Sequence, residues 1–151
     1  MLSPDVIHFF KNASFSIVTT LDVRGGLHNS CKGIVKVKPN GDIYLLDLYK
    51  RQTFKNLQHN SKMSVTGVDE HKFTGYSLKG EGRIAEASEL GSDIIAAWEA
   101  KITSRITQRV INSIQGKKGH PAHPEALLPK PEYLIVMKTK QVVELTPTHL
   151  K

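Results

Sequence analysis

Two adjacent cations, Lys50 and Arg51, lie between a strongly apolar segment and a predicted helix. The helix is expected over residues 53–59, with Thr53 as its N-cap and Asn60 at its C-terminal end. Backbone N–H groups at a helix N-terminus lack intrahelical acceptors and therefore attract anions. A guanidinium can bind phosphate through two hydrogen bonds, and an ammonium adds a point charge. The segment predicts an anion pocket, although on these residues alone a capped surface helix with solvated charges is the commoner structure.

Four other residues have types that occur in reactive or ligand-binding sites. Cys31 is the single cysteine of the chain, and a half-buried strand position is a commoner role for it than a reactive thiol. His120 and His123 lie in a proline-rich loop without the further ligands that a zinc site needs, so no bound metal is expected. Trp98 could stack on a cofactor or line a subunit contact, but an aromatic residue on an apolar helix face is more often part of the core.

Several common catalytic classes lack their sequence motifs here. The chain has no Ser-His-Asp spacing, no Walker loop and no G-x-G-x-x-G motif. Hydrolase and nucleoside-triphosphatase chemistry is therefore not supported.

The composition is that of one soluble globular domain, expected over residues 1–151, with excess positive charge. Of these residues 39% are hydrophobic and 23% are charged, which is enough to build a core. The 21 Lys and Arg residues against 14 Asp and Glu residues give a net charge of +7. This charge favours anionic partners, which include nucleic acids, phosphorylated small molecules and acidic membrane surfaces.

Nucleic-acid binding is the alternative that the basic strands raise. Three lysines and three tyrosines could form a cationic stripe with stacking platforms, namely Lys36, Lys38, Lys79, Tyr44, Tyr49 and Tyr76. A solvated barrel face is the commoner meaning of this pattern. An affinity for oligonucleotides that falls steeply with salt would indicate the stripe, but nucleic acid is not the expected partner.

No segment suggests a membrane or an export signal. No apolar run approaches the roughly 20 residues that span a bilayer. Residues 1–5 do not begin a basic and apolar leader. The single cysteine excludes an intramolecular disulfide framework. We therefore expect a cytoplasmic protein that does not bind membranes.

Over most of the chain, apolar and polar residues alternate in a manner typical of β-strands. β-branched and aromatic residues and turn pairs such as Asn40-Gly41 predict strands over residues 15–21, 27–38, 42–48, 62–68, 75–87, 132–138 and 141–146. The apolar run 44–48 indicates a strand covered on both faces. Gly80 and Gly82 indicate a close approach by another backbone or a ligand. The order of elements favours a mostly β fold, an antiparallel barrel with helices packed outside.

Between residues 90 and 114 the hydrophobic period changes to four, with apolar residues at 90, 94, 98, 102, 106, 110 and 114. Each step of four residues drifts about 40° around a helix, so a straight helix would spread these positions around most of its surface. We expect two helices broken near Thr103 and Ser104, in preference to one long helix that wraps around a curved surface. Gln115-Gly116 ends the helical stretch, and residues 119–131, which include four prolines, predict a loop.

The succession of motifs resembles the pyridoxamine 5′-phosphate oxidase-related, FMN-binding split-barrel family. The resemblance rests on residues 15–21, Gly25-Gly26, 29–31, 41–47, 53–57 with Asn60 and Val65, and 76–82 followed by Ile84. Each motif is degenerate, but their order and spacing together are fairly specific. They extend over roughly residues 10–88, more than half of the chain, whereas the C-terminal third matches only in outline.

This resemblance implies a six-stranded antiparallel split β-barrel that forms a homodimer, with one FMN in each of two clefts at the subunit interface. The residues that it places beside the flavin ring are Asn29, Ser30, Cys31 and Lys32. Those at the end of the neighbouring strand are Asp47 and Leu48. Those that would hold the phosphate are Lys50, Arg51, Gln52 and Thr53. The last set coincides with the anion pocket reached from the residues alone.

The resemblance also implies a flavoprotein oxidoreductase in which FMN carries hydride or electron transfer. The chain ends in residues 142–147 without the Arg-rich substrate motifs of true pyridoxamine phosphate oxidases, so another substrate is expected. A nicotinamide or another small molecule would be the electron donor, and no general acid or base is identified. A non-catalytic module that stores or senses FMN is one alternative, and a relative that holds haem or a deazaflavin is another.

Overall fold

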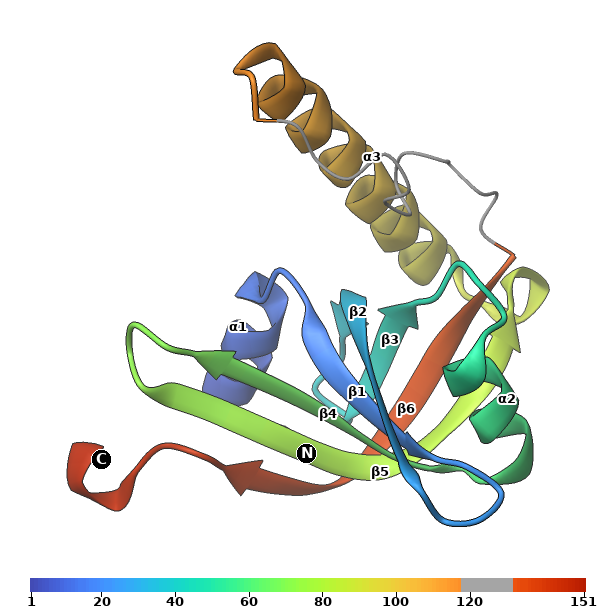
Figure 1. Ribbon diagram of the computed structural model, residues 1–151, viewed down its shortest axis with the longest axis vertical. Coiled ribbons are helices and arrows are strands. Elements are labelled where there is room, and N and C mark those ends of the chain that lie inside the picture. The colour runs from blue at the N-terminus through green and yellow to red at the C-terminus, as the bar shows by residue number, and fades with distance from the viewer. Residues whose placement is uncertain (118–131) are drawn as a thin grey trace.

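In residues 1–117 and 132–151, which the computed structural model describes, six antiparallel strands close into a barrel and three α-helices lie around it (Figure 1). The strand order is β1-β2-β3-β6-β5-β4. The strands are β1 Ser16–Leu21, β2 Leu27–Val37, β3 Asp42–Leu46, β4 Lys62–Asp69, β5 Thr74–Glu86 and β6 Tyr133–Glu144. The helices are α1 Pro4–Asn12, α2 Gln52–His59 and α3 Ser92–Ile114, with 3₁₀ turns η1 Ala87–Glu89 and η2 Thr148–Leu150. The predicted antiparallel barrel is confirmed.

Strand β3 is covered on both faces, as its apolar sequence predicts. Ile43 and Leu45 are fully buried in the main core cluster. Leu46 packs in a second cluster with Ile94 and Trp98 of α3. Trp98 is only 4% exposed, so its expected place in the core is confirmed. The packing of α3 fixes the end of β3, from which the chain leads towards α2.

Strand β2 carries a bulge that turns two nearby apolar residues to the same side. Its register against β3 shifts between Ile34 and Lys36. Ile34 and Val37 are therefore both buried, although simple alternation would place them on opposite faces. The hairpin that follows turns at Gly41, whose φ of +94° fits the expected Asn-Gly turn.

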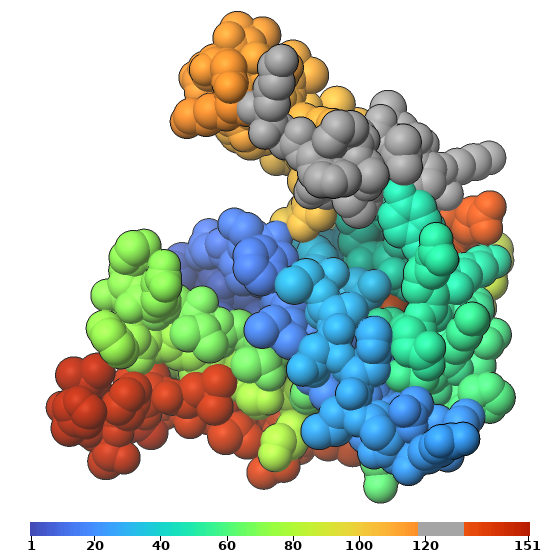
Figure 2. Space-filling model, viewed as in Figure 1, coloured from blue at the N-terminus to red at the C-terminus, as the bar shows by residue number. Residues whose placement is uncertain are grey.

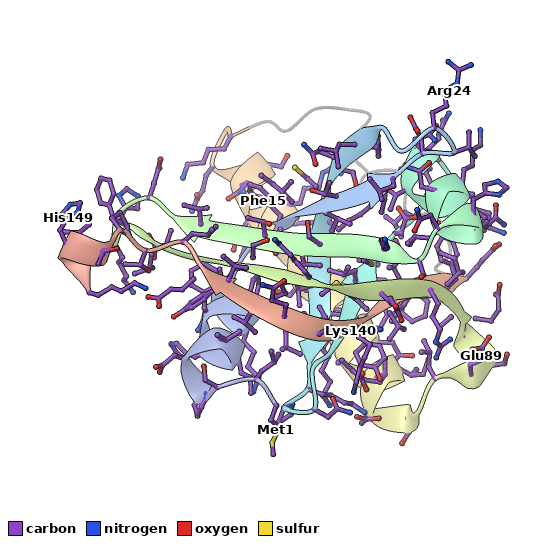
Figure 3. All side chains as sticks on the ribbon, turned by 90° about the horizontal axis from the view of Figure 1, so that it is seen from below. Met1, Phe15, Arg24, Glu89, Lys140 and His149 are labelled. Atoms are coloured by element: carbon purple, nitrogen blue, oxygen red, sulfur yellow. The ribbon has the colours of Figure 1, made fainter. Side chains whose placement is uncertain are left out.

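A single strand, β6, replaces the two strands expected on either side of residues 138–140. Its first half lies between β3 and β5, and its second half continues along β5 alone. Lys138 pairs with Asp42 at 3.1 Å between nitrogen and oxygen. Lys140, labelled in Figure 3, pairs with Glu81 at 2.7 Å. The two lysines that suggest a turn are thus ion-paired side chains of a continuous strand.

Both glycines that the sequence singles out in β5 permit a close approach. A Cβ on Gly80 would collide with the carbonyl oxygen of Lys138 in β6. A Cβ on Gly82 would collide with the side chain of Met63 in β4. The register of β5 against β6 shifts next to Gly80. The two glycines therefore let β5 lie close to both of its neighbours.

Helix α3 is one continuous helix of 23 residues, so the expected break near Thr103 and Ser104 is wrong. Its buried residues are Ile94 and Trp98, near its start. Towards its end the apolar residues are exposed, and Ile114 is 81% exposed. The apolar residues at every fourth position do spread around the helix surface. The helix does not curve around the barrel, however, because only its first part packs against the strands. Figures 1 and 2 show the second half of α3 standing away from the strands.

Helix α1 is not among the predicted elements, although residues 3 and 4 are of types that commonly begin a helix. The Ser3 hydroxyl accepts a hydrogen bond from the Val6 N–H at 3.4 Å, and Pro4 opens the helix. Its apolar face places Val6 and Phe10 in the same core cluster as the strands, and Phe10 is fully buried. Helix α1 is thus part of the barrel core.

Two expectations, the loop over 119–131 and the histidine pair His120 and His123, lie outside the described residues. Within residues 1–117 and 132–151, no three His, Cys, Asp or Glu side chains are grouped so that they could hold a metal ion. In the same part of the chain, no helix combines the length and the hydropathy that crossing a bilayer requires.

Candidate functional site

A pocket of about 430 Å³ lies where β3 ends and α2 begins, and we call it the β3–α2 pocket. Its lining residues are Asp47, Leu48, Tyr49, Lys50, Arg51, Glu132 and Tyr133. The first five connect β3 to α2, and the last two lead into β6. Because Leu46 lies opposite Leu134 in the β3–β6 pairing, the start of β6 meets this connection.

Asp47 is the buried centre of a charged network beside the pocket. The Lys32 ammonium lies 2.6 Å from its Oδ1 atom, and the Tyr133 hydroxyl donates to its Oδ2 atom at 2.7 Å. The side chains of Lys32 and Asp47 are 14% and 3% exposed, so the ion pair lies largely out of water. Each carboxylate oxygen is engaged by the protein itself. Asp47 is therefore first an anchor for Lys32 and Tyr133.

The buried position of Tyr133 affects its ionisation. Burial raises the pKa of Tyr133 well above its usual value because it disfavours the phenolate, and the hydrogen bond to Asp47 acts in the same direction. The phenol therefore keeps its proton at neutral pH and continues to donate it to Asp47. This bond ties β6 to the end of β3.

Lys50 is held near the pocket by two aromatic rings. Its ammonium lies 5.5 Å from the ring centroid of Phe54 and 5.8 Å from that of Tyr133, which is within the range of cation–π attraction. A carboxylate oxygen of Glu132 lies 3.7 Å away, but both side chains are more than half exposed, so this ion pair is weak. The charge of Lys50 is thus available to an anion.

Arg51 and the start of α2 present further donors at the same place. The Arg51 side chain is exposed, and within residues 1–117 and 132–151 no partner pairs with its guanidinium. Arg51 is also the N-cap of α2, and no side chain from these residues caps the first turn. The N–H groups of that turn therefore lie beside the two cations. This geometry supports the anion pocket that the sequence predicts.

Thr53 is not the N-cap of this helix. The helix begins at Gln52, and the Thr53 hydroxyl lies 2.9 Å from the Ser30 hydroxyl of β2. Strand β2 runs beside the helix start, so the buried hydroxyl of Thr53 bonds to the strand instead of to its own first turn. The Gln52 side chain is also engaged, because it donates to Asn56 at 2.6 Å. Thr53 thus joins α2 to β2, whereas Gln52 bonds within its own helix.

The four β2 residues expected beside a flavin ring do not share one surface. Ser30 and Lys32 point towards α2 and the pocket. Asn29 lies on the opposite face, where it accepts a hydrogen bond from Thr19 at 2.7 Å. Cys31 lies on that face too, and it is exposed instead of half-buried. Successive side chains of a strand alternate, so the side chains of Ser30 and Lys32 can face the pocket while those of Asn29 and Cys31 face away from it.

The β3–α2 pocket gathers only part of the predicted cofactor set, namely Asp47, Leu48, Lys50 and Arg51. Sequence reasoning misses Glu132 and Tyr133, because only the pairing of β6 with β3 brings them here. It treats Tyr49 only as a stacking platform. The structure places Tyr49 in the pocket lining, with its hydroxyl buried and without a hydrogen-bond partner among the described residues.

The residues of the alternative nucleic-acid stripe gather only in part. Lys36 lies opposite Tyr44, and the Lys38 ammonium lies 5.6 Å from the Tyr44 ring centroid, whereas Tyr49 lines the β3–α2 pocket. Lys36 and Lys38 both pair with Asp93 at the start of α3, at 3.1 and 3.3 Å. The hydrogen bond from Lys36 is the largest cause that lowers the pKa of Asp93. Tyr76 packs edge-on against Phe9, with ring centroids 5.2 Å apart. These lysines and this tyrosine are thus used within the fold.

The fold is a small antiparallel barrel with a pocket between a strand end and a helix start, and two cations, Lys50 and Arg51, are among the residues that line it. The family model of pyridoxamine 5′-phosphate oxidase matches residues 2–150. The chain therefore belongs to the pyridoxamine 5′-phosphate oxidase family, which confirms the resemblance seen in its motifs. No curated protein sequence shows significant similarity to it.

Solved structures resemble this one over nearly their whole length. HupZ of Group A Streptococcus has a TM-score of 0.65 at 18% identity, with 97% of this chain and 95% of that chain covered. A Clostridium acetobutylicum protein related to general stress protein 26, of the pyridoxinephosphate oxidase family, has a TM-score of 0.56 at 12% identity, with 97% and 95% covered. HutZ, the heme storage protein of Vibrio cholerae, has a TM-score of 0.55 at 14% identity, with 94% and 93% covered. At these identities the likeness shows the fold alone.

The residues present fit a mononucleotide cofactor at its phosphate end. The pocket offers the Arg51 guanidinium, the Lys50 ammonium and uncapped N–H groups to an anion. Its volume of about 430 Å³ lies within the usual range of small-molecule sites. Leu48 and the ring of Tyr133 add apolar surface to the lining. The lining thus suits a ligand with one anionic end and one largely apolar end.

Proposed function

We propose that this protein binds FMN in the β3–α2 pocket and is a flavin-dependent oxidoreductase that acts on a substrate other than pyridoxamine phosphate. The observation that carries the proposal is the meeting of Lys50, the exposed Arg51 and the start of α2 at one pocket. Membership of the family supports a flavin as the phosphate-bearing ligand. When bound, FMN would supply hydride or electron transfer.

The residues of the pocket have separate roles in this proposal. Lys50, Arg51 and the first-turn N–H groups of α2 bind and orient the phosphate. Asp47 holds Lys32 in one position beside the pocket. Tyr133 keeps Asp47 in place through its hydrogen bond.

The paired substitution Lys50→Ala and Arg51→Ala should lower the affinity for FMN at least tenfold. Hydrogen bonds to charged groups contribute about 1.5–3 kcal/mol each, and about 1.4 kcal/mol corresponds to a factor of ten. Both side chains are exposed, so folding should be unaffected. Flavin-fluorescence titration measures the affinity. Lys55→Ala, on an exposed side of the same helix, is the control that should bind normally, and unchanged binding by the paired variant would refute the phosphate site.

Catalysis is tested by reduction of the bound flavin. Bleaching of the flavin absorbance by NADH or NADPH in a single turnover would support the oxidoreductase. If neither nicotinamide reduces it, the module that stores or senses FMN becomes the better description. A cytoplasmic location, where these reductants are present, is part of the proposal and is supported by the single cysteine.

Haem binding is the second candidate, and two observations favour it. HutZ, which has the same fold, is a heme storage protein. Tyr49 lines the β3–α2 pocket, and a tyrosine phenol is one of the side chains that bind haem iron. The absorption spectrum of the purified protein separates a flavin, a deazaflavin and a haem. A colourless protein that takes up none of them on addition would contradict both candidates.

We also propose a homodimer in which a second copy covers one side of the barrel. Where β1, β2 and β4 pair, their outward side chains carry no charge, and we call this the uncharged face: Ile17, Thr19, Leu21, Leu27, Asn29, Cys31, Ser64 and Thr66. Because 23% of the chain is charged, an outer surface without charges supports a protein contact. Asn29 and Cys31 neighbour Ser30 and Lys32 along β2, so this contact would adjoin the pocket.

Ile17→Lys should convert the proposed dimer into a monomer. Ile17 is 42% exposed on the uncharged face, so a lysine there can fold but would place a charge in the contact. Light scattering at micromolar concentration gives the mass. Val142→Lys is the control, because Val142 lies in β6, outside the uncharged face, with a similar exposure of 40%. A wild-type monomer, or an Ile17→Lys variant that stays dimeric, would contradict the proposed contact.

A further inference from the structure

We propose that the second half of α3 is a contact surface for a second copy of this chain, in which the α3 helices of two molecules cross and pack against each other. The inference goes beyond the proposed function, and it depends neither on the β3–α2 pocket nor on the uncharged face. It concerns one side of the helix, which we call the outer α3 face and which consists of Thr103, Ile106, Thr107, Val110, Ile111 and Ile114.

In its second half, α3 turns its cations towards its own barrel. The Arg105 guanidinium donates to the Ser14 carbonyl oxygen at 3.0 Å, and it lies so close to β2 that a Cβ on Gly33 would collide with it. Lys101 and Arg109 lie four residues before and after Arg105, so each is only about 40° from it around the helix. All three cations are partly buried. Arg105 thus marks the side of α3 that faces the barrel.

The apolar residues of the second half lie on the opposite side. Val110 and Ile114 follow Arg105 by five and nine residues, which places them about 140° and about 180° around the helix from it. Val110 is 53% exposed and Ile114 is 81% exposed, whereas Ile94 and Trp98 in the first half are buried against the barrel. A helix that packs only on its own barrel keeps its apolar residues on one side. The change of side therefore indicates a second surface that covers the end of α3.

The outer α3 face has a shape into which a copy of itself fits. Its residues form two parallel rows with a spacing of four, Thr103-Thr107-Ile111 and Ile106-Val110-Ile114. Rows of this spacing on two helices interdigitate when the helices cross at about −50°, the commonest packing class in globular proteins. Each molecule presents both a row and the groove beside it, so one two-fold axis satisfies both molecules at once.

The positions of the charges favour a second copy over a membrane. Within residues 100–114 the charged side chains are Lys101, Arg105 and Arg109, and none of them belongs to the outer α3 face. Two such faces can therefore meet without bringing cations together. A helix that lies on an anionic membrane uses its cationic side to reach the lipid headgroups. In α3 that side faces the barrel, and Arg105 already donates to the fold.

The size of the outer α3 face sets the strength of the contact. It has six residues in each molecule, whereas a stable interface has about 20–30 a side. The contact is therefore weak, and it forms at concentrations well above the micromolar range in which the mass of the proposed dimer is measured. There it joins two of the species that are present at low concentration.

Sedimentation velocity between about 5 and about 500 µM tests this association, since weak contacts form in that range. Physiological salt of about 0.15 M screens the positive net charge. The mass of the wild type should rise towards twice its low-concentration value. Val110→Lys should abolish the rise, because it places a charge in the middle of the contact. Gln108→Lys adds the same charge about 160° around the helix from Val110 and should associate as the wild type does.

Both substituted side chains are exposed, so both variants should fold, and thermal unfolding followed by circular dichroism checks this. A wild-type mass that stays constant over the range overturns the inference. So does a Val110→Lys variant that still associates, or a Gln108→Lys variant that loses association as Val110→Lys does.

Cross-linking tests the crossing itself. Cys31 is the only cysteine, so Val110→Cys in a Cys31→Ser background has one thiol. Val110 lies in the middle of its row, and a two-fold crossing brings the two copies of it close together. Oxidation with diamide should link two chains through Val110→Cys and leave Gln108→Cys, in the same background, unlinked. Equal linkage of the two variants overturns the crossing.

Two further arms separate the α3 contact from other associations. Ile17→Lys should keep the concentration-dependent doubling, because it changes the uncharged face and not α3. If it loses the doubling, a separate α3 contact is overturned. Vesicles of phosphatidylglycerol and phosphatidylcholine should leave the protein in solution, and binding to them that Val110→Lys abolishes would assign the face to lipid instead. None of these measurements uses FMN, so their failure leaves the proposed function standing, and a protein that binds no flavin leaves this inference standing.

Discussion

Asp47→Ala should destabilise the protein by about 3–5 kcal/mol, because breaking a buried ion pair leaves the other charge without compensation. The remaining ammonium, that of Lys32, is only 14% exposed. The Tyr133 hydroxyl would lose its acceptor in the same substitution. Urea unfolding followed by tryptophan fluorescence measures the change, since Trp98 is the only tryptophan and is buried beside the end of β3.

Asp93→Ala is the matched control for this variant. Asp93 also pairs with lysines, Lys36 and Lys38, at 3.1 and 3.3 Å, but its side chain is 50% exposed. Exposed ion pairs contribute little to stability because water and salt screen them, so the loss of stability should be small. If Asp47→Ala and Asp93→Ala lower the free energy of unfolding equally, the ion pair of Asp47 is no more shielded from water than the exposed ion pairs of Asp93.

Phe10→Ala should lower the free energy of unfolding by about 3–5 kcal/mol, the usual range for truncation of a buried phenylalanine. Phe10 is fully buried, and its ring lies edge-on to that of Phe9 with centroids 5.1 Å apart. The same urea unfolding measures the loss. Phe73→Ala, at a site that is 64% exposed, should change stability little. A loss below about 1 kcal/mol for Phe10→Ala would show that α1 only rests on the barrel surface.

The strands could be predicted because their signals are local. Alternation of side chains and the Asn40-Gly41 turn depend only on neighbouring residues. The interpretation of residues 138–140 as a turn is wrong because their exposure depends on where β3 begins, at Asp42, which is distant in sequence. The break expected in α3 is wrong for a similar reason. Nothing in the sequence near Thr103 indicates that the helix leaves the barrel.

Some residues of the candidate site could likewise be predicted from a local pattern, and others could not. Lys50, Arg51 and Asp47 lie close together in sequence, so a local pattern finds them. Glu132 and Tyr133 join the pocket through strand pairing and give no local signal. Carrying the family pattern over residue by residue also ignores the alternation along β2, which turns every second side chain of residues 29–32 away from α2.

The place of β6 between β3 and β5 has a consequence for synthesis of the protein. The strand that closes the barrel begins only after residue 132. While the ribosome is still translating that last strand, β3 and β5 keep open hydrogen-bonding edges, which are prone to join the edges of other chains. The Tyr133–Asp47 bond also cannot form until then. The barrel and its pocket are therefore completed together, only once β6 has been synthesised, by pairings between distant parts of the chain, which form slowly.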